Sequence, residues 1–104
     1  MAMHIDIETG LKALASDKRL FVLELLKDPT ANFPPQVDGD LIEDGVCANW
    51  LTERLEVSQP TAARHLKVLV DAGFIIPTRK KGWVFYRRNE DDINRFKKAI
   101  SEAV

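Results

Sequence analysis

The chain has 104 residues, of which 45% are hydrophobic and 30% charged, and its formal net charge is −1. A chain of this length builds one hydrophobic core, so we expect a single domain over residues 1–104. The sequence lacks both an export signal and the roughly 20-residue apolar run of a membrane span, and its single cysteine excludes an internal disulfide framework; together these features predict a cytoplasmic protein with no membrane partner.

The first quarter of the chain predicts two helices. The first helix is predicted from apolar residues at helical spacing near the start of the chain: Ile5, Ile7, Leu11 and Leu14. Gly10 weakens this prediction, because glycine is a poor helix former. A stronger helix follows over residues 18–27, where apolar residues nearly surround the axis: Phe21, Val22, Leu23, Leu25 and Leu26. Because such a helix is buried on more than one side, we expect it to be the central core helix.

Residues 28–46 form the least regular segment, because three prolines and two glycines forbid a long helix. Four apolar residues indicate that the segment still packs down, with a short strand pairing with a later hairpin: Val37, Leu41, Ile42 and Val46. The segment also carries four carboxylates, at Asp38, Asp40, Glu43 and Asp44. Their spacing does not fit a calcium-binding loop, so we expect a solvated acidic loop and no metal site.

Residues 46–76 contain two short helical patterns separated by a tight turn, which is typical of a helix-turn-helix. Ser58 is a suitable N-cap for the second helix, and Pro60 lies in the first turn, where its missing N–H costs nothing. At about 100° per residue, one side of this helix is apolar (Ala62, Leu66, Leu69 and Val70). Arg64 and Lys67 point the opposite way, and Gly73 stands where a left-handed C-cap is expected.

Two strands and a last helix complete the chain. Residues 74–80 and 83–88 predict a hairpin with Lys80-Lys81-Gly82 at the bend. Asn89 is a suitable cap for a helix over about 91–103, whose apolar positions form a narrow stripe: Ile93, Phe96, Ile100 and Ala103. Such a stripe favours a helix–helix contact over a broad core contact.

The positive charge is concentrated on the second helix of this motif and the hairpin. Residues 58–88 contain seven Lys and Arg against one Asp, whereas residues 1–57 contain five against eleven Asp and Glu. Cations that contact phosphates supply most of the non-specific affinity for DNA, so residues 58–88 are where a DNA-binding surface is expected.

The sequence from Leu51 to Phe74 resembles the winged-helix repressors of the ArsR type. The resemblance rests on Ser58-Gln59-Pro60 at the turn, on Arg64-His65-Leu66-Lys67-Val68-Leu69 in the recognition helix, and on Ala72-Gly73-Phe74 at its exit. Ala63 departs from the serine usual in the family. The resemblance implies a mainly α fold with a small β-hairpin wing (α+β), a winged helix-turn-helix of about five helices.

The resemblance also implies a site and an assembly. Double-stranded DNA is the expected partner, with these residues in contact: Ser58, Gln59, Pro60, Thr61, Arg64, His65, Lys67, Arg79, Lys80 and Lys81. In the family the first and last helices form a two-fold dimer, which these residues would supply here: Ile5, Ile7, Leu11, Ile93, Phe96 and Ile100. The alternative is that they complete a monomer core. A dimer would place two recognition helices about one DNA turn apart, roughly 34 Å, and so read an inverted repeat.

The metal sites that many family members use are incomplete in this sequence. Of the family's cysteine positions, which correspond to Cys47, Asn49 and Thr52, only Cys47 is a cysteine, and one thiolate cannot hold a soft metal. The other metal site of the family lies on the last helix and combines histidine with Asp or Glu. Here the predicted last helix has Asp91 and Asp92 but no histidine. We therefore expect no metal and no cofactor. Cys47 is either a redox sensor or a small buried apolar residue, and the effector is unknown.

We therefore predict a sequence-specific transcriptional regulator, a homodimeric repressor that binds DNA through its recognition helix and wing. The alternative is a winged-helix protein-interaction module without direct DNA binding. The sequence shows no nucleophile with a spaced base and no phosphate-binding glycine loop, so we do not expect an enzyme.

Overall fold

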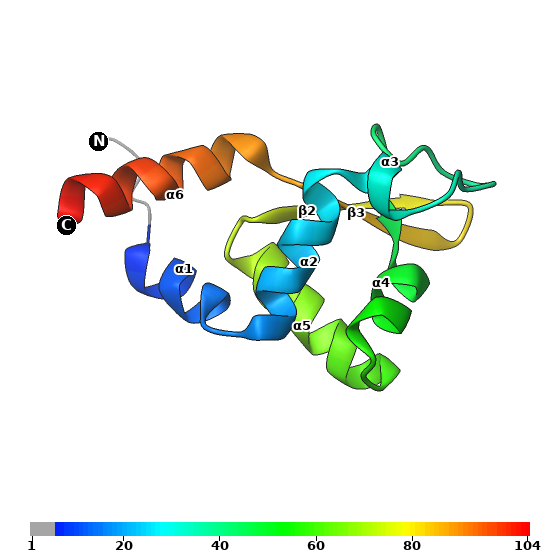
Figure 1. Ribbon diagram of the computed structural model, residues 1–104, viewed down its shortest axis with the longest axis horizontal. Helices are drawn as coiled ribbons and strands as arrows, with labels where there is room; N and C mark the ends of the chain where they lie inside the picture. Colours follow the sequence, from blue (N-terminus) through cyan, green and yellow to red (C-terminus); the bar gives the residue numbers. More distant parts are fainter. Residues whose placement is uncertain (1–5) are drawn as a thin grey trace.

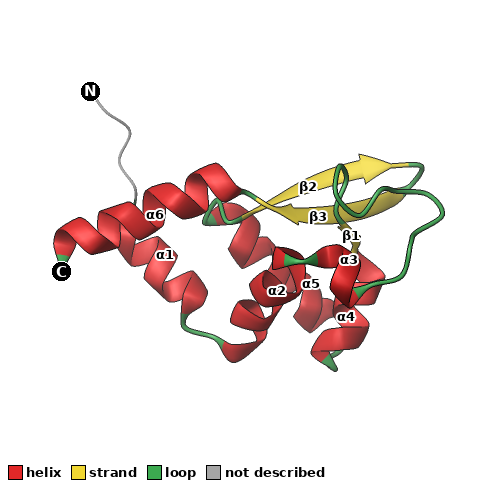
Figure 2. Ribbon diagram, turned by 45° about the horizontal axis from the view of Figure 1, so that its top comes forward, coloured by secondary structure: helices red, strands yellow, loops and turns green. Residues whose placement is uncertain are grey.

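The computed structural model describes residues 6–104, so Ile5 lies outside the described residues. Six helices and three strands follow in the order α1 (Ile7–Leu14), α2 (Asp17–Lys27), α3 (Pro29–Asn32), β1 (Val46–Cys47), α4 (Ala48–Leu55), α5 (Gln59–Asp71), β2 (Ile75–Lys80), β3 (Trp83–Arg88) and α6 (Glu90–Ala103). The fold is the expected mainly α winged helix-turn-helix (Figures 1 and 2). The helix beyond the five expected is α3, a single turn within residues 28–46, which were expected to be irregular.

Most helices begin at a polar residue whose side-chain oxygen accepts a hydrogen bond from a backbone N–H of the first turn. Ser16 caps α2 and Ser58 caps α5, each accepting the N–H three residues ahead at 3.3 Å. Asn89 caps α6 in the same way through the N–H of Asp92. Because these side chains replace the missing helical acceptors, the sequence itself fixes where the helices begin.

The core forms where α2 passes between α5, α4 and the sheet. Its largest fully buried side chains come from five different elements: Val22, Val46, Leu51, Leu55, Leu69 and Ile75. Figure 1 shows α2 in the middle of the molecule, with α5 and α4 below it and α6 along the top. This arrangement confirms the second helix as the central helix of the core.

The sheet has the order β1-β3-β2 and is antiparallel throughout. The short strand expected before α4 is β1, in which Val46 pairs with Tyr86 of β3. The preceding loop packs down only in part, because Leu41 is buried whereas Val37 is 97% exposed and Ile42 is 61% exposed. The prediction was therefore wrong for Val37 and Ile42, since the loop buries only one side of its chain.

Helix α1 packs against α6 at the end of the molecule opposite the hairpin tip (Figure 1). Gly10 makes this contact possible, because a Cβ at this position would overlap the ring of Phe96. That ring contacts Phe74 edge to face, with centroids 5.1 Å apart and planes at 78°.

Within residues 6–104, no helix has the length and apolar character needed to cross a membrane.

Candidate nucleic-acid interface

The recognition helix α5 begins with exposed polar residues and carries its apolar residues on one face. Ser58, Gln59 and Pro60 are exposed, and the Ser58 Oγ also lies 3.0 Å from the Thr61 Oγ1. The opposite face is buried in the core, since Ala62, Leu66 and Leu69 are at most 2% exposed. The N-terminus of α5 therefore offers exposed polar side chains and the positive end of the helix dipole to an anion, while its apolar face is fixed in the core.

Arg64 and Lys67 project into solvent from α5, as the helical spacing predicted. Lys67 is paired along its own helix, with its Nζ 2.9 Å from the Asp71 Oδ2, and both side chains are mostly exposed. An ion pair this exposed contributes little to stability and is readily exchanged for another anion. Both cations therefore remain accessible to a phosphate or a base.

His65 lies on the inner border of α5, where it contacts α2. Its Nδ1 is 3.0 Å from the Arg19 Nη1, and because arginine can only donate, Nδ1 is the acceptor. Partial burial, followed by the charges of Arg19 and Arg64, lowers the pKa of His65 below its usual value. The ring is therefore neutral near pH 7 and holds two helices together.

Arg19 is a residue whose role the sequence did not reveal. Its guanidinium donates to the carbonyl oxygens of Lys12 and Ala13 as well as to His65. It thereby adds side-chain hydrogen bonds to the carbonyls at the end of α1 and ties α1 to the recognition helix. Helical spacing shows that Arg19 neighbours apolar residues but not which carbonyls it reaches.

Helix α5 ends in a Schellman motif at the predicted glycine. Gly73 has φ +85°, its N–H donates to the Val70 carbonyl, and the Phe74 N–H donates to the Leu69 carbonyl. This pattern needs a left-handed residue after the helix, which glycine adopts without strain. The chain therefore turns directly from the recognition helix into β2.

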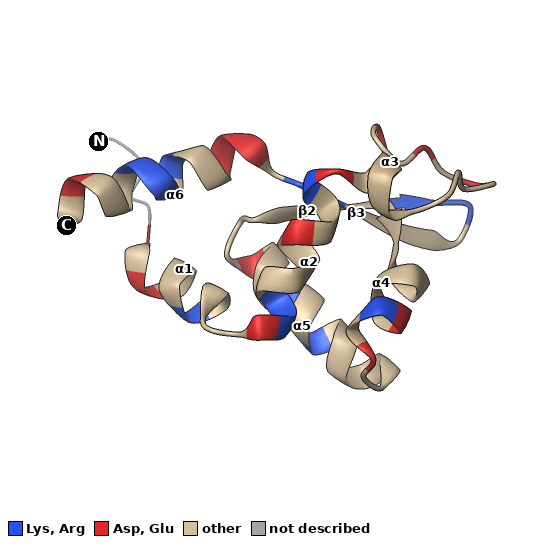
Figure 3. Ribbon diagram, in the orientation of Figure 1, with Lys and Arg blue, Asp and Glu red and all other residues tan. Residues whose placement is uncertain are grey.

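The wing tip is a two-residue turn with positive φ at both central residues, Lys81 (+54°) and Gly82 (+81°). Lys80 pairs with Trp83 across it, which is the geometry of a type I′ hairpin. Arg79, Lys80 and Lys81 are all exposed. Figure 3 shows this basic tip next to the acidic residues of the loop that joins α3 to β1.

That loop supplies carboxylates to the wing tip. The Lys80 Nζ lies 3.1 Å from the Asp44 Oδ2, and the Lys81 Nζ lies 4.0 Å from the Asp38 Oδ1. The Asp40 backbone N–H, and then Lys80, lower the pKa of the Asp44 carboxyl, so Asp44 is charged near pH 7. Among residues 6–104, no ion pair involves Arg64 or Arg79.

The residues predicted to form a dimer interface differ in exposure. Leu11 is 51% exposed, and Ile7 and Ile100 are partly exposed, whereas Ile93 and Phe96 are only 6% and 7% exposed. Ile93 and Phe96 therefore belong to the core of the chain itself, the alternative that the sequence had left open.

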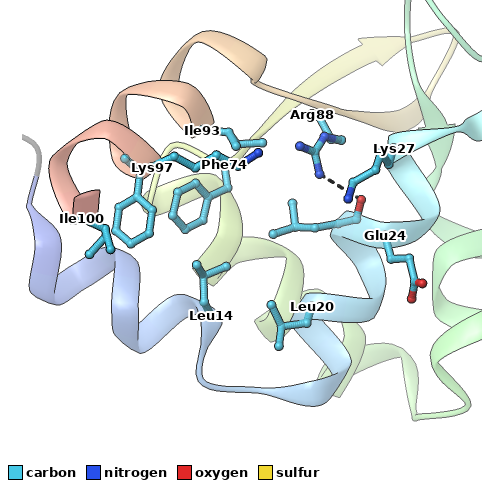
Figure 4. Close-up of a pocket in the computed structure, with 11 residues that line it drawn as sticks. Leu14, Leu20, Glu24, Lys27, Phe74, Arg88, Ile93, Lys97 and Ile100 are labelled. Atoms are coloured by element: carbon cyan, nitrogen blue, oxygen red, sulfur yellow. Dashed lines mark hydrogen bonds between the residues drawn. The ribbon is translucent and has the colours of Figure 1, made fainter. Parts of the chain in front are cut away.

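A mostly apolar groove of about 520 Å³ runs between α1, α2 and α6. Leu14, Leu20 and Ile100 are among the apolar residues that line it (Figure 4). Arg88 closes one end, where its guanidinium donates to the Leu23 carbonyl and pairs with Glu90. This end of the molecule thus exposes apolar side chains from the first, second and last helices.

Cys47 precedes α4 and is partly exposed. Its backbone N–H donates to the Gln36 Oε1, and Cys47 lines a second, smaller pocket together with Trp50 and Phe85. Within the part of the chain that the structure describes, no group of three or more His, Cys, Asp or Glu side chains is placed to hold a metal ion.

Comparison with known proteins identifies the family. Residues 41–76 match the sequence family described as "Bacterial regulatory protein, arsR family". The chain is 36% identical over 84 residues to the HTH-type transcriptional regulator YbzH of Bacillus subtilis (strain 168), covering 81% of this chain and 84% of that protein. It is 33% identical over 88 residues to an arsenical resistance operon repressor of the same strain, covering 84% and 70%.

Solved structures share the fold. A crystal structure of an ArsR family transcriptional regulator superposes with a TM-score of 0.70 at 17% identity, covering 99% of this chain and 92% of that one. An ArsR-like transcriptional regulator from Rhodococcus sp. RHA1 gives a TM-score of 0.66 at 21% identity, covering 93% and 77%. The sequence matches and the winged helix-turn-helix geometry agree, and the chain belongs to the arsR family of bacterial transcriptional regulators.

Proposed function

We propose that this regulator is a cytoplasmic repressor that binds double-stranded DNA as a homodimer at an inverted repeat. The observation that carries the proposal is the division of α5 into two faces. One face is closed in the core by Ala62, Leu66 and Leu69, while Arg64 and Lys67 project from the other. A helix held in this way can enter a major groove without losing its packing. The arsenical resistance repressor among the relatives supports repression.

In this proposal the first half of α5 reads bases and the wing holds the backbone. Arg64 can donate two hydrogen bonds to guanine and Gln59 can pair with adenine, each worth about 1–3 kcal/mol of discrimination. Ser58, Pro60 and Thr61 would lie close to a phosphate at the helix N-terminus. Arg79, Lys80 and Lys81 would contact backbone phosphates beside the groove. His65 is occupied by Arg19, so we assign it a structural role.

The placement of the elements supports a dimer that is built on the first and last helices. In Figure 1 the N-terminal end of α5 and the hairpin tip lie at the right of the view, whereas α1 and α6 lie at the left. A second copy packed on α1 and α6 would leave both reading helices and both wings free. The exposed Leu11 and the partly exposed Ile7 and Ile100 are the residues we expect at this contact.

The test separates base reading from backbone contact. Duplexes selected from a random pool identify the preferred sequence, and binding is then measured by fluorescence anisotropy for Arg64→Ala and Lys81→Asn. We choose asparagine for position 81 because it tolerates the positive φ of the turn. Arg64→Ala should relax the base preference, whereas Lys81→Asn should weaken all duplexes alike and reduce the salt slope by up to about 0.9.

The same experiment distinguishes this proposal from its alternative. If the wild-type protein shows no salt-dependent binding to any duplex near 0.1 M ionic strength, the DNA-binding proposal fails and a protein-interaction module remains. Equal losses of base preference in both variants would refute the assigned division between α5 and the wing.

A further inference from the structure

The loop between α3 and β1, residues 33–45, has a defined internal structure, and we name it the acidic loop. The Asp40 Oδ1 accepts the N–H groups of Ile42 and Glu43, both at 2.8 Å. The Asp44 Oδ2 accepts the Asp40 N–H at 2.8 Å, and the N–H groups of Asp44 and Gly45 donate back to the Asp40 carbonyl. These bonds close residues 40–45 into a turn that fixes the position of the Asp44 carboxylate.

Two further contacts hold the acidic loop against the sheet. The Gln36 side chain donates to the Gly45 carbonyl at 2.9 Å and accepts the Cys47 N–H at 2.8 Å, which attaches the loop to β1. Gly39 lies against the Phe85 ring so closely that a Cβ there would be 2.6 Å from a ring carbon. The loop is therefore anchored beside the wing independently of any ion pair.

The carboxylates held in this way meet the two cations at the wing tip. Only 15% of the Asp44 side chain is exposed, and its partner Lys80 is 47% exposed. Asp38 and Lys81, which lie 4.0 Å apart, are 39% and 68% exposed. A carboxylate oxygen and a phosphate oxygen are interchangeable acceptors for a lysine ammonium. Each carboxylate consequently pairs with a lysine ammonium that could otherwise pair with a phosphate.

We propose that the acidic loop is a built-in competitor for the DNA backbone, which masks the wing tip and lowers the affinity of the regulator for every duplex. This inference rests on the proposed DNA-binding function. Lys80 must leave Asp44, or share it, before it can contact a phosphate, whereas Arg64 on α5 has no such competitor among residues 6–104. The loop thus reduces sequence-independent binding more than it reduces base reading.

An alternative role for the same contact predicts the opposite sign. If the Asp44–Lys80 pair serves to hold the wing in its binding position, removing the carboxylate loosens the wing and weakens DNA binding. If the pair masks Lys80, removing the carboxylate strengthens binding. The direction of the change therefore separates the two roles.

The experiment measures duplex binding by Asp44→Asn, Glu43→Gln and Lys80→Ala, and by Asp44→Asn combined with Lys80→Ala. Asparagine keeps a side-chain oxygen that can accept the Asp40 N–H, so the turn is preserved. Glu43→Gln is the matched control, because it removes the same charge from the same loop at an exposed position. Asp38→Asn, which releases Lys81, is a second variant should Asp44→Asn fail to fold.

We expect Asp44→Asn to bind about two- to fivefold more tightly at 0.1 M salt, because a partly exposed ion pair no longer competes. Glu43→Gln should change the affinity by less than about 1.5-fold, since its charge acts only through screened solvent. In the Lys80→Ala background the gain from Asp44→Asn should disappear.

Other outcomes overturn the inference in distinguishable ways. A gain that is equal for Asp44→Asn and Glu43→Gln and persists without Lys80 would show that only net charge matters. Weaker binding by Asp44→Asn would show that the loop positions the wing. If neither the wild type nor any variant binds a duplex, the proposed function itself fails.

Discussion

Replacing Gly10 with alanine should destabilise the protein, although alanine is the better helix former. Alanine in the interior of α1 would gain about 1 kcal/mol from helix propensity. Its Cβ, however, would lie 2.6 Å from Cδ1 of Phe96, 3.0 Å from Cζ, and closer still to Cε1. The ring cannot turn aside freely, because it is 7% exposed and in edge-to-face contact with Phe74.

Overlap of this kind in a packed core costs about 1–3 kcal/mol, so it offsets or exceeds the propensity gain. The net loss reaches about 2 kcal/mol, which in a domain of this size lowers Tm by about 4–8 °C for each kcal/mol. Thermal unfolding followed by circular dichroism at one fixed protein concentration measures the change. Fixing the concentration matters because a dimer would make Tm depend on it.

A second background makes the prediction specific to the contact. In Phe96→Leu the ring is absent, so Gly10→Ala should raise Tm relative to Phe96→Leu alone. A rise in Tm on introducing alanine into the wild type, or the same shift in both backgrounds, would refute the argument that the Phe96 ring requires glycine at this position.

Four further predictions concern the recognition helix and the β1–β3 pairing. Burial, and then the charge of Arg19, lower the pKa of His65, so below about pH 6.5 the unfolded chain binds a proton more readily than the folded chain does. The free energy of unfolding should therefore fall as the pH drops from 6.5 through the folded-state pKa. In urea titrations at several pH values, His65→Gln should flatten that fall. Leu69→Ala should lower the free energy of unfolding by about 2–5 kcal/mol in the same assay, because the side chain is fully buried, and a loss below 1 kcal/mol would contradict its place in the core. Ser58→Ala should cost about 0.5–2 kcal/mol by removing the N-cap of α5, whereas Ser58→Asp should restore most of it. Gly45→Ala should cost at least about 1–2 kcal/mol from its positive φ alone, and the overlap with the Tyr86 carbonyl should also break the β1–β3 pairing, which hydrogen exchange of the β1 amides would report.

The parts of the fold that local chemistry determines were predictable from the sequence. Helical spacing identified the buried face of α5, and Ser58, Asn89 and Gly73 correctly marked where helices begin and end, because caps act on neighbouring N–H and carbonyl groups. The hairpin was predictable for the same reason, since its turn and alternation are local. The position of β1 beside the wing was expected from its apolar residues.

Contacts between distant segments were not predictable in this way. Nothing in the spacing of Arg19 shows that it reaches both the end of α1 and His65, 46 residues away. The pairing of Asp44 with Lys80 depends on how the loop folds over β3, which single-sequence patterns do not encode. Ile93 and Phe96 form the same apolar stripe whether they face a partner or their own core, so periodicity could not separate the two.

The aromatic contact between the end of α5 and helix α6 has a consequence for how two copies would read one DNA site. Phe74 follows the recognition helix after only two residues and contacts Phe96 of the last helix directly. The recognition helix is therefore coupled to the last helix by direct packing across this aromatic pair. In a dimer built on α6, the separation of the half-sites would be set by the packing of this aromatic pair, and a change in its geometry would alter which operator spacing the protein accepts.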